Sequence, residues 1–219
     1  MKLKTALVSK TKPFRNAIVM TTTYFLAPTL YKQGYLVETR PMTEFLSNNY
    51  RTTLTGVEVG VENGDNALSM LANLRFQKLY LVDEYKDFIE GGKIREAARW
   101  LPVARKRLNK YDNVEFIVQS SVNASKSVPD NLDFVYIDAN HAYDYIKEDI
   151  AAWYPKVRNG GVIGGHDITW PGVYWAVTEF VQKNNLYLYT STPCDWWVVK
   201  GKSYSSFYNT KEMSNHTTF

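Results

Sequence analysis

Two different patterns of apolar residues alternate along the chain between residues 54 and 200. Short runs rich in β-branched and aromatic residues are followed by longer stretches whose apolar residues recur every three or four positions. The short runs predict buried strands, and the longer stretches predict amphipathic helices. Strands are predicted at 55–60, 78–83, 114–119, 132–138, 160–167, 186–191 and 195–200. Helices are predicted at 65–74, with Asp65 as the N-cap, and at 95–110, 142–155 and 172–184.

Strict alternation of strands and helices is typical of a parallel sheet with helices on both faces and right-handed crossovers. The last two strands have too little chain between them for a helical crossover, so that pair is predicted to be antiparallel. The fold class is therefore α/β. Residues 1–50 lack the alternation and are predicted to form an N-terminal extension, with a helix near Met42–Asn49 as a candidate cover for a bound substrate. Residues 51–200 form the predicted domain, and residues 201–219 a polar tail.

Composition narrows the class of protein. Hydrophobic residues make up 45% of the chain and charged residues 22%, as in soluble globular proteins. The net charge of +4 is small, and the most basic stretch, 95–110, is interpreted as a solvated helix face, so nucleic acid is not an expected partner. The single cysteine, Cys194, excludes a disulfide within one chain and favours a reducing, cytoplasmic location. The N-terminal apolar run is too short for a signal peptide, and no stretch approaches the ~20 apolar residues of a membrane span.

Polar and acidic residues follow five of the predicted strands. The clusters read GVENGD, DEYKD, QSS, DANH and HDIT. Ligands of open parallel sheets bind beyond the carboxyl ends of the strands. Because solubility alone does not explain polar clusters at five such ends, we expect a functional site along this edge.

The loop after the first strand indicates the kind of cofactor. A dinucleotide site needs G-x-G-x-x-G, and Val61 and Glu62 stand where those glycines would be. Glu58 and Glu62 would repel a diphosphate and suit a cationic ligand. Asp83 follows about 20 residues later at the end of the second strand, where a carboxylate commonly receives ribose hydroxyls. A nucleoside with a positive appendage and no phosphate, such as S-adenosylmethionine, fits this loop better than NAD does.

These motifs resemble those of class I S-adenosylmethionine-dependent methyltransferases. More narrowly, the chain is similar to the branch of macrocin-type sugar O-methyltransferases and cephalosporin-hydroxylase-like proteins. The similarity runs from about residue 54 to residue 200, and it is most specific at 138–167. It implies a Rossmann-like, doubly wound sheet of seven strands, mostly parallel with an antiparallel last strand. It also implies cofactor-binding roles for Glu58, Gly60, Glu62, Gly64, Asp83, Ser120, Ser121 and Asp138. Ser120 and Ser121 are expected near the adenine, although the family often has an aspartate where Ser120 stands.

The resemblance also implies chemistry at the fourth and fifth strand ends. Related enzymes often bind a divalent metal there, so Asp138, His166 and Asp167 are the predicted ligands of magnesium or manganese. His166 departs from the family pattern and shifts the balance towards manganese, zinc or no metal, because magnesium prefers oxygen. The alternative is that the two aspartates shape the pocket through hydrogen bonds.

Histidine titrates near neutrality, so His141 and His166 are candidate general bases, with Asp138 as the third catalytic candidate. The alternative for His141 is that it caps the following helix. Trp170, Trp196 and Trp197 are candidates for an acceptor pocket, with core packing expected for at least one of them.

The predicted function is O-methylation of a small hydroxylated acceptor, such as a sugar or a natural-product intermediate. Methylation of nitrogen or nucleic acid is one alternative, and a non-catalytic cofactor-binding protein is another. The sequence leaves open whether the chain forms homo-oligomers.

Overall fold

The computed structural model describes residues 39–90, 92–191 and 194–204. Most of the predicted N-terminal extension, and the tail beyond residue 204, lie outside this range. The described residues from Thr39 to Tyr204 form one compact unit, so the only described part of the predicted extension belongs with the sheet. No helix in the described ranges combines the length and the hydropathy needed to cross a bilayer.

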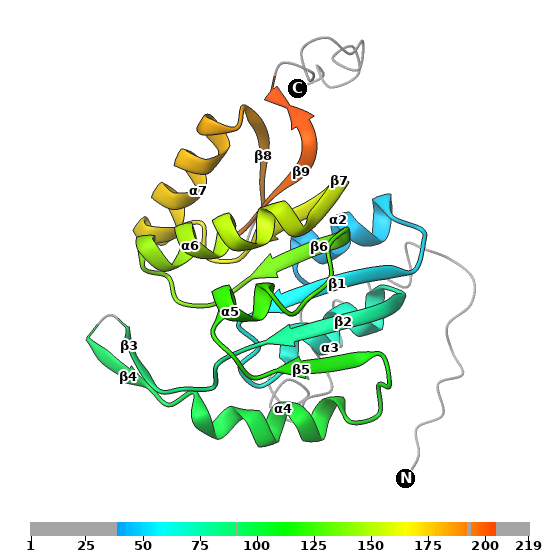
Figure 1. Ribbon diagram of the computed structural model, residues 1–219, viewed down its shortest axis with the longest axis vertical. Coiled ribbons are helices and arrows are strands. Elements are labelled where there is room, and N and C mark those ends of the chain that lie inside the picture. The colour runs from blue at the N-terminus through cyan, green and yellow to red at the C-terminus, as the bar shows by residue number, and fades with distance from the viewer. Residues whose placement is uncertain (1–38, 91, 192–193, 205–219) are drawn as a thin grey trace, which may run out of the picture. The chain divides into compact units, whose positions relative to one another are not determined.

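A seven-stranded sheet forms the centre of this unit (Figure 1). The strand order is β5-β2-β1-β6-β7-β9-β8. Neighbouring strands from β5 to β7 are parallel, and β9 is antiparallel to both β7 and β8. The predicted fold class, with its reversed last strand, is therefore confirmed. The strands are β1 (Leu54–Val59), β2 (Phe76–Val82), β5 (Val114–Ile117), β6 (Leu132–Ile137), β7 (Val157–Gly165), β8 (Leu186–Ser191) and β9 (Asp195–Ser203).

Helices cover both faces of the sheet. Buried residues of α5 (Ser121–Ser125), α6 (Tyr143–Trp153) and α7 (Pro171–Lys183) share one apolar cluster with the sheet. Those of α2 (Pro41–Asn49), α3 (Asp65–Asn73) and α4 (Leu101–Leu108) share the other. Two short 3₁₀ turns, η1 (Ala98–Trp100) and η2 (Tyr154–Lys156), complete the helical elements.

The central strand β6 shows how the sequence directs side chains to the two faces. Phe134 and Tyr136 lie in the cluster with α2, α3 and α4, whereas Val135 and Ile137 lie in the cluster with α5, α6 and α7. Successive side chains of a strand point to opposite faces, so a continuous apolar run is needed where both faces are covered. Each such side chain contributes about 1.5–3 kcal/mol on burial, which fixes the register of the strand.

Two local predictions were wrong. The helix predicted at 95–110 begins only at Leu101, with Pro102 in its first turn, where proline fits best. The preceding residues form an antiparallel hairpin of β3 (Phe88–Glu90) and β4 (Lys93–Arg95), which extends away from the sheet in Figure 1. The N-cap of α3 is Gly64 in the left-handed conformation rather than Asp65, whose side chain pairs with Arg107 at 2.7 Å.

Helix α2 covers the stretch where a helix was predicted, and it is tied into the sheet. Met42 and Leu46 are buried against the strands. The amide of Met42 donates to Asp195 Oδ2 at 3.0 Å, and the hydroxyl of Tyr136 donates to Asp195 Oδ1 at 2.9 Å. A buried carboxylate thus anchors the start of α2 to β6 and β9. This contact holds the preceding residue, Arg40, near the end of β6.

Candidate functional site

The carboxyl ends of the parallel strands are joined by backbone hydrogen bonds. Gly60 N donates to Val82 O at 2.8 Å, Asp138 N donates to Val59 O at 2.7 Å, and His166 N donates to Ile137 O at 3.1 Å. Three of the loops predicted to carry the site therefore begin side by side. The structure therefore brings the polar residues that follow these strands together at one edge of the sheet, as predicted.

The glycine loop after β1 is pressed against the end of β6. Gly60 has a φ of +84°, and a Cβ there would overlap the carbonyl oxygen of Asp138. Only glycine satisfies both conditions without strain. Glu62 also has a positive φ of 48°, which turns the loop back towards β2.

Asp83 holds this loop in place. Its Oδ2 accepts hydrogen bonds from the amides of Val61 at 2.9 Å and Glu62 at 3.0 Å, and its Oδ1 accepts one from the amide of Tyr85 at 2.7 Å. A carboxylate has about four acceptor positions, so three amides leave one for another donor. The ribose contact of Asp83 stays a prediction, and the structure adds a role in shaping the loop.

Glu58 is a buried acid with one unpartnered oxygen. The residue is 1% exposed, and its Oε1 accepts a hydrogen bond from Asn66 Nδ2 at 2.9 Å. Its Oε2 has no hydrogen-bond partner among the described residues. Burial raises the pKa of Glu58 to about 8, and the nearby negative charge of Asp138 adds to this effect. A buried acceptor without a partner is costly, so a donor group of a ligand would be stabilised there, and the role of Glu58 in cofactor binding stays a prediction.

His141 lies among three carboxylates. Its Nδ1 lies 2.7 Å from Glu90 Oε1, and its Nε2 lies 2.9 Å from Asp167 Oδ2 and 3.9 Å from Asp138 Oδ1. Burial opposes the charged imidazolium, but the contacts with Asp138 and Asp167 and the charge of Glu90 outweigh burial and raise the pKa of His141 to about 10. His141 therefore carries a proton at neutral pH and cannot accept one there, which weakens its predicted role as general base.

His141 does not cap the helix that follows it. The N-cap of α6 is Ala142, and no side chain caps this helix. The ring of Trp170 stacks on the His141 ring at 4.8 Å between centroids. Trp170 is 40% exposed, whereas Trp196 and Trp197 are buried in the core, so Trp170 alone of the three tryptophans faces outward beside the site.

Asp167 joins two clusters of ligand-type side chains. It adopts a φ of +58°, and its Oδ2 lies near both His141 and His166 Nδ1, the latter at 3.1 Å. These two histidines outweigh the effect of burial and hold the pKa of Asp167 well below its usual range. On the other side, Cys194 Sγ lies 3.2 Å from His166 Nε2. Burial raises the pKa of the Cys194 thiol, so the thiol is not an activated nucleophile.

The three predicted metal ligands do not fall in one group of close ligand atoms. Arg40 Nη2 lies 3.4 Å from Asp138 Oδ2, and the protonated His141 faces the other oxygen of the same carboxylate. Two positive groups already neutralise Asp138. Asp138 also belongs to a different group of close ligand atoms from His166, and the two groups share only Asp167. Magnesium can bind through two carboxylates and water, and Asp138 and Asp167 do lie in one group, so the metal stays a prediction, with His166 outside that group.

Other predicted cofactor residues have structural partners. Ser121 Oγ accepts a hydrogen bond from Trp153 Nε1 at 2.8 Å, and Ser120 is the N-cap of α5. Their predicted contact with adenine stays a prediction. Arg40, Glu90 and Cys194 were missed by sequence reasoning, because each lies far along the chain from the residues it contacts.

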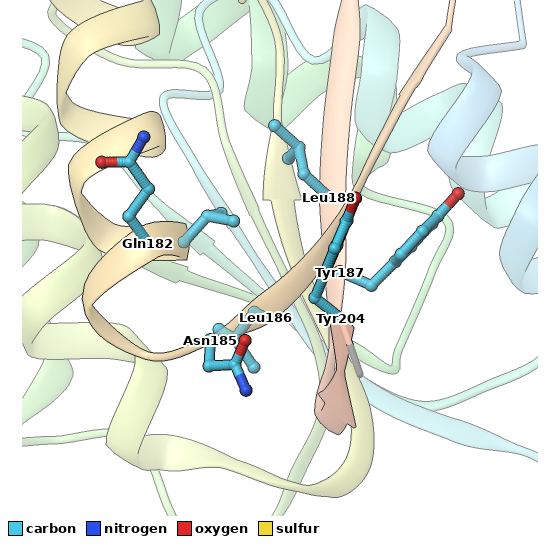
Figure 2. Close-up of a pocket in the computed structure, with 7 residues that line it drawn as sticks. Gln182, Asn185, Leu186, Tyr187, Leu188 and Tyr204 are labelled. Atoms are coloured by element: carbon cyan, nitrogen blue, oxygen red, sulfur yellow. The ribbon is translucent and has the colours of Figure 1, made fainter. Parts of the chain in front are cut away.

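A further hollow lies away from these strand ends. Its volume is about 570 Å³, and it lies between the end of α7 and the start of β8 (Figure 2). Because β8 runs parallel to β7, its start is at the amino-terminal edge of the sheet, opposite the strand ends described above. The hollow contains none of the predicted site residues. Its lining includes Gln182, Asn185, Leu186, Tyr187, Leu188 and Tyr204.

The fold and the site define a class of protein. A family model described as a methyltransferase domain matches residues 57–168, just over half of the chain. The chain belongs to this methyltransferase-domain family. It is an S-adenosylmethionine-dependent methyltransferase with the class I fold, as its sequence motifs predicted.

Solved structures share this fold at low sequence identity. The O-methyltransferase NovP is 19% identical with a TM-score of 0.56, over 72% of this chain and 76% of NovP. A protein from Streptococcus mutans assigned as a methyltransferase, in complex with SAH, is 17% identical with a TM-score of 0.54, over 74% and 97% of the two chains. A protein from Staphylococcus aureus assigned as a caffeoyl-CoA O-methyltransferase is 11% identical with a TM-score of 0.59, over 87% and 99%. No curated protein sequence matches the chain.

Proposed function

We propose that the protein transfers the methyl group of S-adenosylmethionine to a hydroxyl oxygen of a small acceptor, such as a sugar or a natural-product intermediate. The observation that carries the proposal is the contact between the glycine loop and the end of β6. Gly60 packs against Asp138, so the cofactor loop with Glu58 adjoins the cluster of Asp138, His141 and Asp167. A methyl donor and an acceptor held on the two sides of this contact would meet.

Different residues of the chain would bind the cofactor, position the acceptor and take up the proton. The cofactor supplies an activated methyl group. Glu58 would accept the cationic end of the cofactor, and the loop held by Asp83 would shape its binding surface. Holding the acceptor oxygen in line with the methyl group supplies much of the rate. The hydroxyl proton would leave towards Asp138 or His166, because His141 is already protonated.

Two observations favour a small acceptor with a hydroxyl group. NovP and the Staphylococcus aureus protein carry O-methyltransferase names, and both share the fold. Three of the six basic side chains at 95–110 pair with carboxylates of the chain, which lowers the net charge of this stretch: Arg95 pairs with Glu90, Arg99 with Glu96, and Arg107 with Asp65. A surface that tracks nucleic acid needs unpaired positive charges.

The test combines binding with product analysis. S-adenosylmethionine and S-adenosylhomocysteine are expected to bind with micromolar affinity, about −7 to −8 kcal/mol, in calorimetry, and NAD is not. With methyl-labelled cofactor, a panel of hydroxylated small molecules should yield methyl ethers. Label found only on nitrogen or on RNA would overturn the choice of acceptor. Tight NAD binding without a response to S-adenosylhomocysteine would contradict the choice of cofactor.

A further inference from the structure

Arg40 brings a largely unpaired positive charge to the strand-end edge. It is the N-cap residue of α2, and its backbone is fixed by Pro41 in the first turn and by the bond from Met42 to Asp195. Within the described ranges its ion pair is the 3.4 Å contact of Nη2 with Asp138 Oδ2, and its Nη1 is buried without a hydrogen-bond partner. A guanidinium has five N–H donors, so most donors of Arg40 are unused.

Glu58 brings an incompletely paired acid to the same side of the sheet. It is aligned with Tyr136 of β6, so both side chains lie on the face that α2 and α3 cover. Its Oε1 accepts from Asn66 of α3, whereas its Oε2 has no partner among the described residues. The Oδ1 atom of Asn66 is a second buried acceptor there without a partner. This face therefore offers two unused acceptors.

Arg40 and Glu58 lie near each other beside the ends of β1 and β6. Arg40 contacts Asp138, whose amide donates to the carbonyl of Val59, the residue after Glu58. Burial is the main cause of the raised pKa of Glu58, and the positive charge of Arg40 opposes it, so the two charges act on each other. They form no ion pair with one another, and each keeps a buried atom without a partner. The two residues therefore suit a ligand that carries both an anionic and a cationic group.

We propose that Arg40 binds the carboxylate at the methionine end of S-adenosylmethionine, while Glu58 and Asn66 accept hydrogen bonds from the ammonium group on the same carbon. A guanidinium matches a carboxylate with two parallel hydrogen bonds, which makes arginine suited to this role. Buried polar atoms without partners are costly, so one zwitterionic ligand would relieve all three. Arg40 lies outside residues 57–168, which the family model matches, so the family does not assign this role.

Two other roles for Arg40 predict different behaviour. In the first, Arg40 serves only to neutralise Asp138 and to hold the start of α2. In the second, it binds an acidic group of the methyl acceptor. Either role would account for Arg40 alone, whereas a zwitterion accounts for Arg40 Nη1, Glu58 Oε2 and Asn66 Oδ1 together. The inference concerns the cofactor and does not depend on which acceptor is methylated.

Two ligands that differ by one carboxylate test the proposal without any measurement of activity. S-adenosylhomocysteine has the complete amino acid end, and its decarboxylated analogue has an aminopropyl group there instead. Both are titrated into the purified full chain in a calorimeter. The wild type should bind the analogue about 10–100-fold more weakly, because hydrogen bonds to charged groups contribute about 1.5–3 kcal/mol.

Variants of Arg40 assign this difference to one side chain. Arg40→Gln should weaken binding of S-adenosylhomocysteine by about 10–100-fold and leave binding of the analogue within about 3-fold of the wild type. Binding of the analogue also reports that the variant is folded. Arg40→Lys keeps the charge but loses the paired geometry, so it should recover part of the affinity. Arg51→Gln is the matched control: Arg51 is exposed and precedes the start of β1, so both affinities should stay unchanged.

Three outcomes would overturn the proposal. Equal affinity of the wild type for the two ligands would show that no residue recognises the carboxylate. An equal loss for both ligands in Arg40→Gln and in Arg40→Lys would leave Arg40 only its contact with Asp138. Unchanged cofactor affinity with a raised KM for the acceptor would assign Arg40 to the acceptor. Methyl ether formation is measured separately, so the proposed function can hold when this inference fails, and the reverse.

Discussion

The two halves of the strand-end edge are built in different ways. The half around β1 and β2, proposed to bind the cofactor and called the cofactor half, comes from one stretch, 58–85. Backbone amides make most of its contacts, as where Asp83 accepts from Val61 and Glu62. The half around β6 and β7, proposed to bind the acceptor and called the acceptor half, is a network of charged side chains, in which Glu90 reaches His141 from the β3–β4 hairpin. The first half depends on backbone shape and the second on charges brought from distant segments. Backbone changes should therefore damage the first half, and charge changes the second.

The largest effect is expected for Gly60→Ala. The new Cβ meets the carbonyl of Asp138 at a φ of +84°, so the loop must move away from β6. We expect cofactor affinity to fall about 100-fold or more and the unfolding free energy to drop by about 2–4 kcal/mol, measured by calorimetry and urea unfolding.

Gly201→Ala is the matched control for this change. Gly201 has a φ of +87°, and a Cβ there would meet nothing within 4 Å. Its cost should be the strain of the left-handed conformation alone, about 1 kcal/mol, with cofactor affinity unchanged. Equal effects of the two variants would show that close approach to β6 does not shape the cofactor half.

Glu58→Gln tests the buried charge of the cofactor half. The pKa of Glu58 is raised to about 8 in the folded chain, against 4.5 when exposed, so between these values the folded state binds the extra proton. Without cofactor, wild-type stability should fall as the pH rises from about 4.5 to about 8. The Gln variant lacks this loss and should be more stable than the wild type at pH 8 by a few kcal/mol, at most about 4.

The same variant should bind S-adenosylmethionine about 10-fold more weakly, because the carboxylate no longer meets the cationic group. Unfolding curves at several pH values, with and without cofactor, measure both effects. A parallel pH dependence of the wild type and the Gln variant would show that Glu58 is not the titrating group.

Glu90→Gln tests the acceptor half by removing one charge beside His141. Glu90 is 8% exposed at its side chain and also pairs with Arg95. We expect methyl transfer to slow about 10–30-fold through kcat, because the His141 ring loses its partner on Nδ1, with cofactor affinity unchanged. Glu96→Gln is the control, since its pair with Arg99 is exposed on both sides and should matter little. A loss of cofactor affinity instead would place the hairpin in the other half.

The position of Glu58, Gly60 and Asp83 at one edge of the sheet, in the half proposed to bind the cofactor, could be predicted from the sequence, because they lie close together along the chain. Glu58 lies near the end of β1, Gly60 follows β1 and Asp83 follows β2; both strands have clear apolar runs, and the sheet order places their ends together. The fold was predictable for the same reason: a strand covered on both faces, such as β6, needs an unbroken apolar run.

The acceptor half could be predicted from the sequence only in part, because its contacts join segments that lie far apart along the chain. Ile89 and Ile94 pair across the hairpin, yet both are more than 70% exposed, so no buried apolar run marks these two short strands. The sequence therefore predicted one helix and hid the contact of Glu90 with His141. Cys194 lies 28 residues from His166, and nothing local marks it as a partner.

Ser121→Ala has the smallest expected effect, and it tests where the cofactor half ends. Ser121 Oγ accepts a hydrogen bond from the buried Trp153 indole at 2.8 Å, and it also faces Asp149, whose pKa burial raises to about 6. Loss of one such bond should lower the unfolding free energy by about 1 kcal/mol. If the hydroxyl serves only this packing of α5 against α6, cofactor affinity should stay the same in calorimetry. A selective loss of cofactor affinity with unchanged stability would instead support the predicted contact with adenine, and it would extend the cofactor half from β1 and β2 to the end of β5.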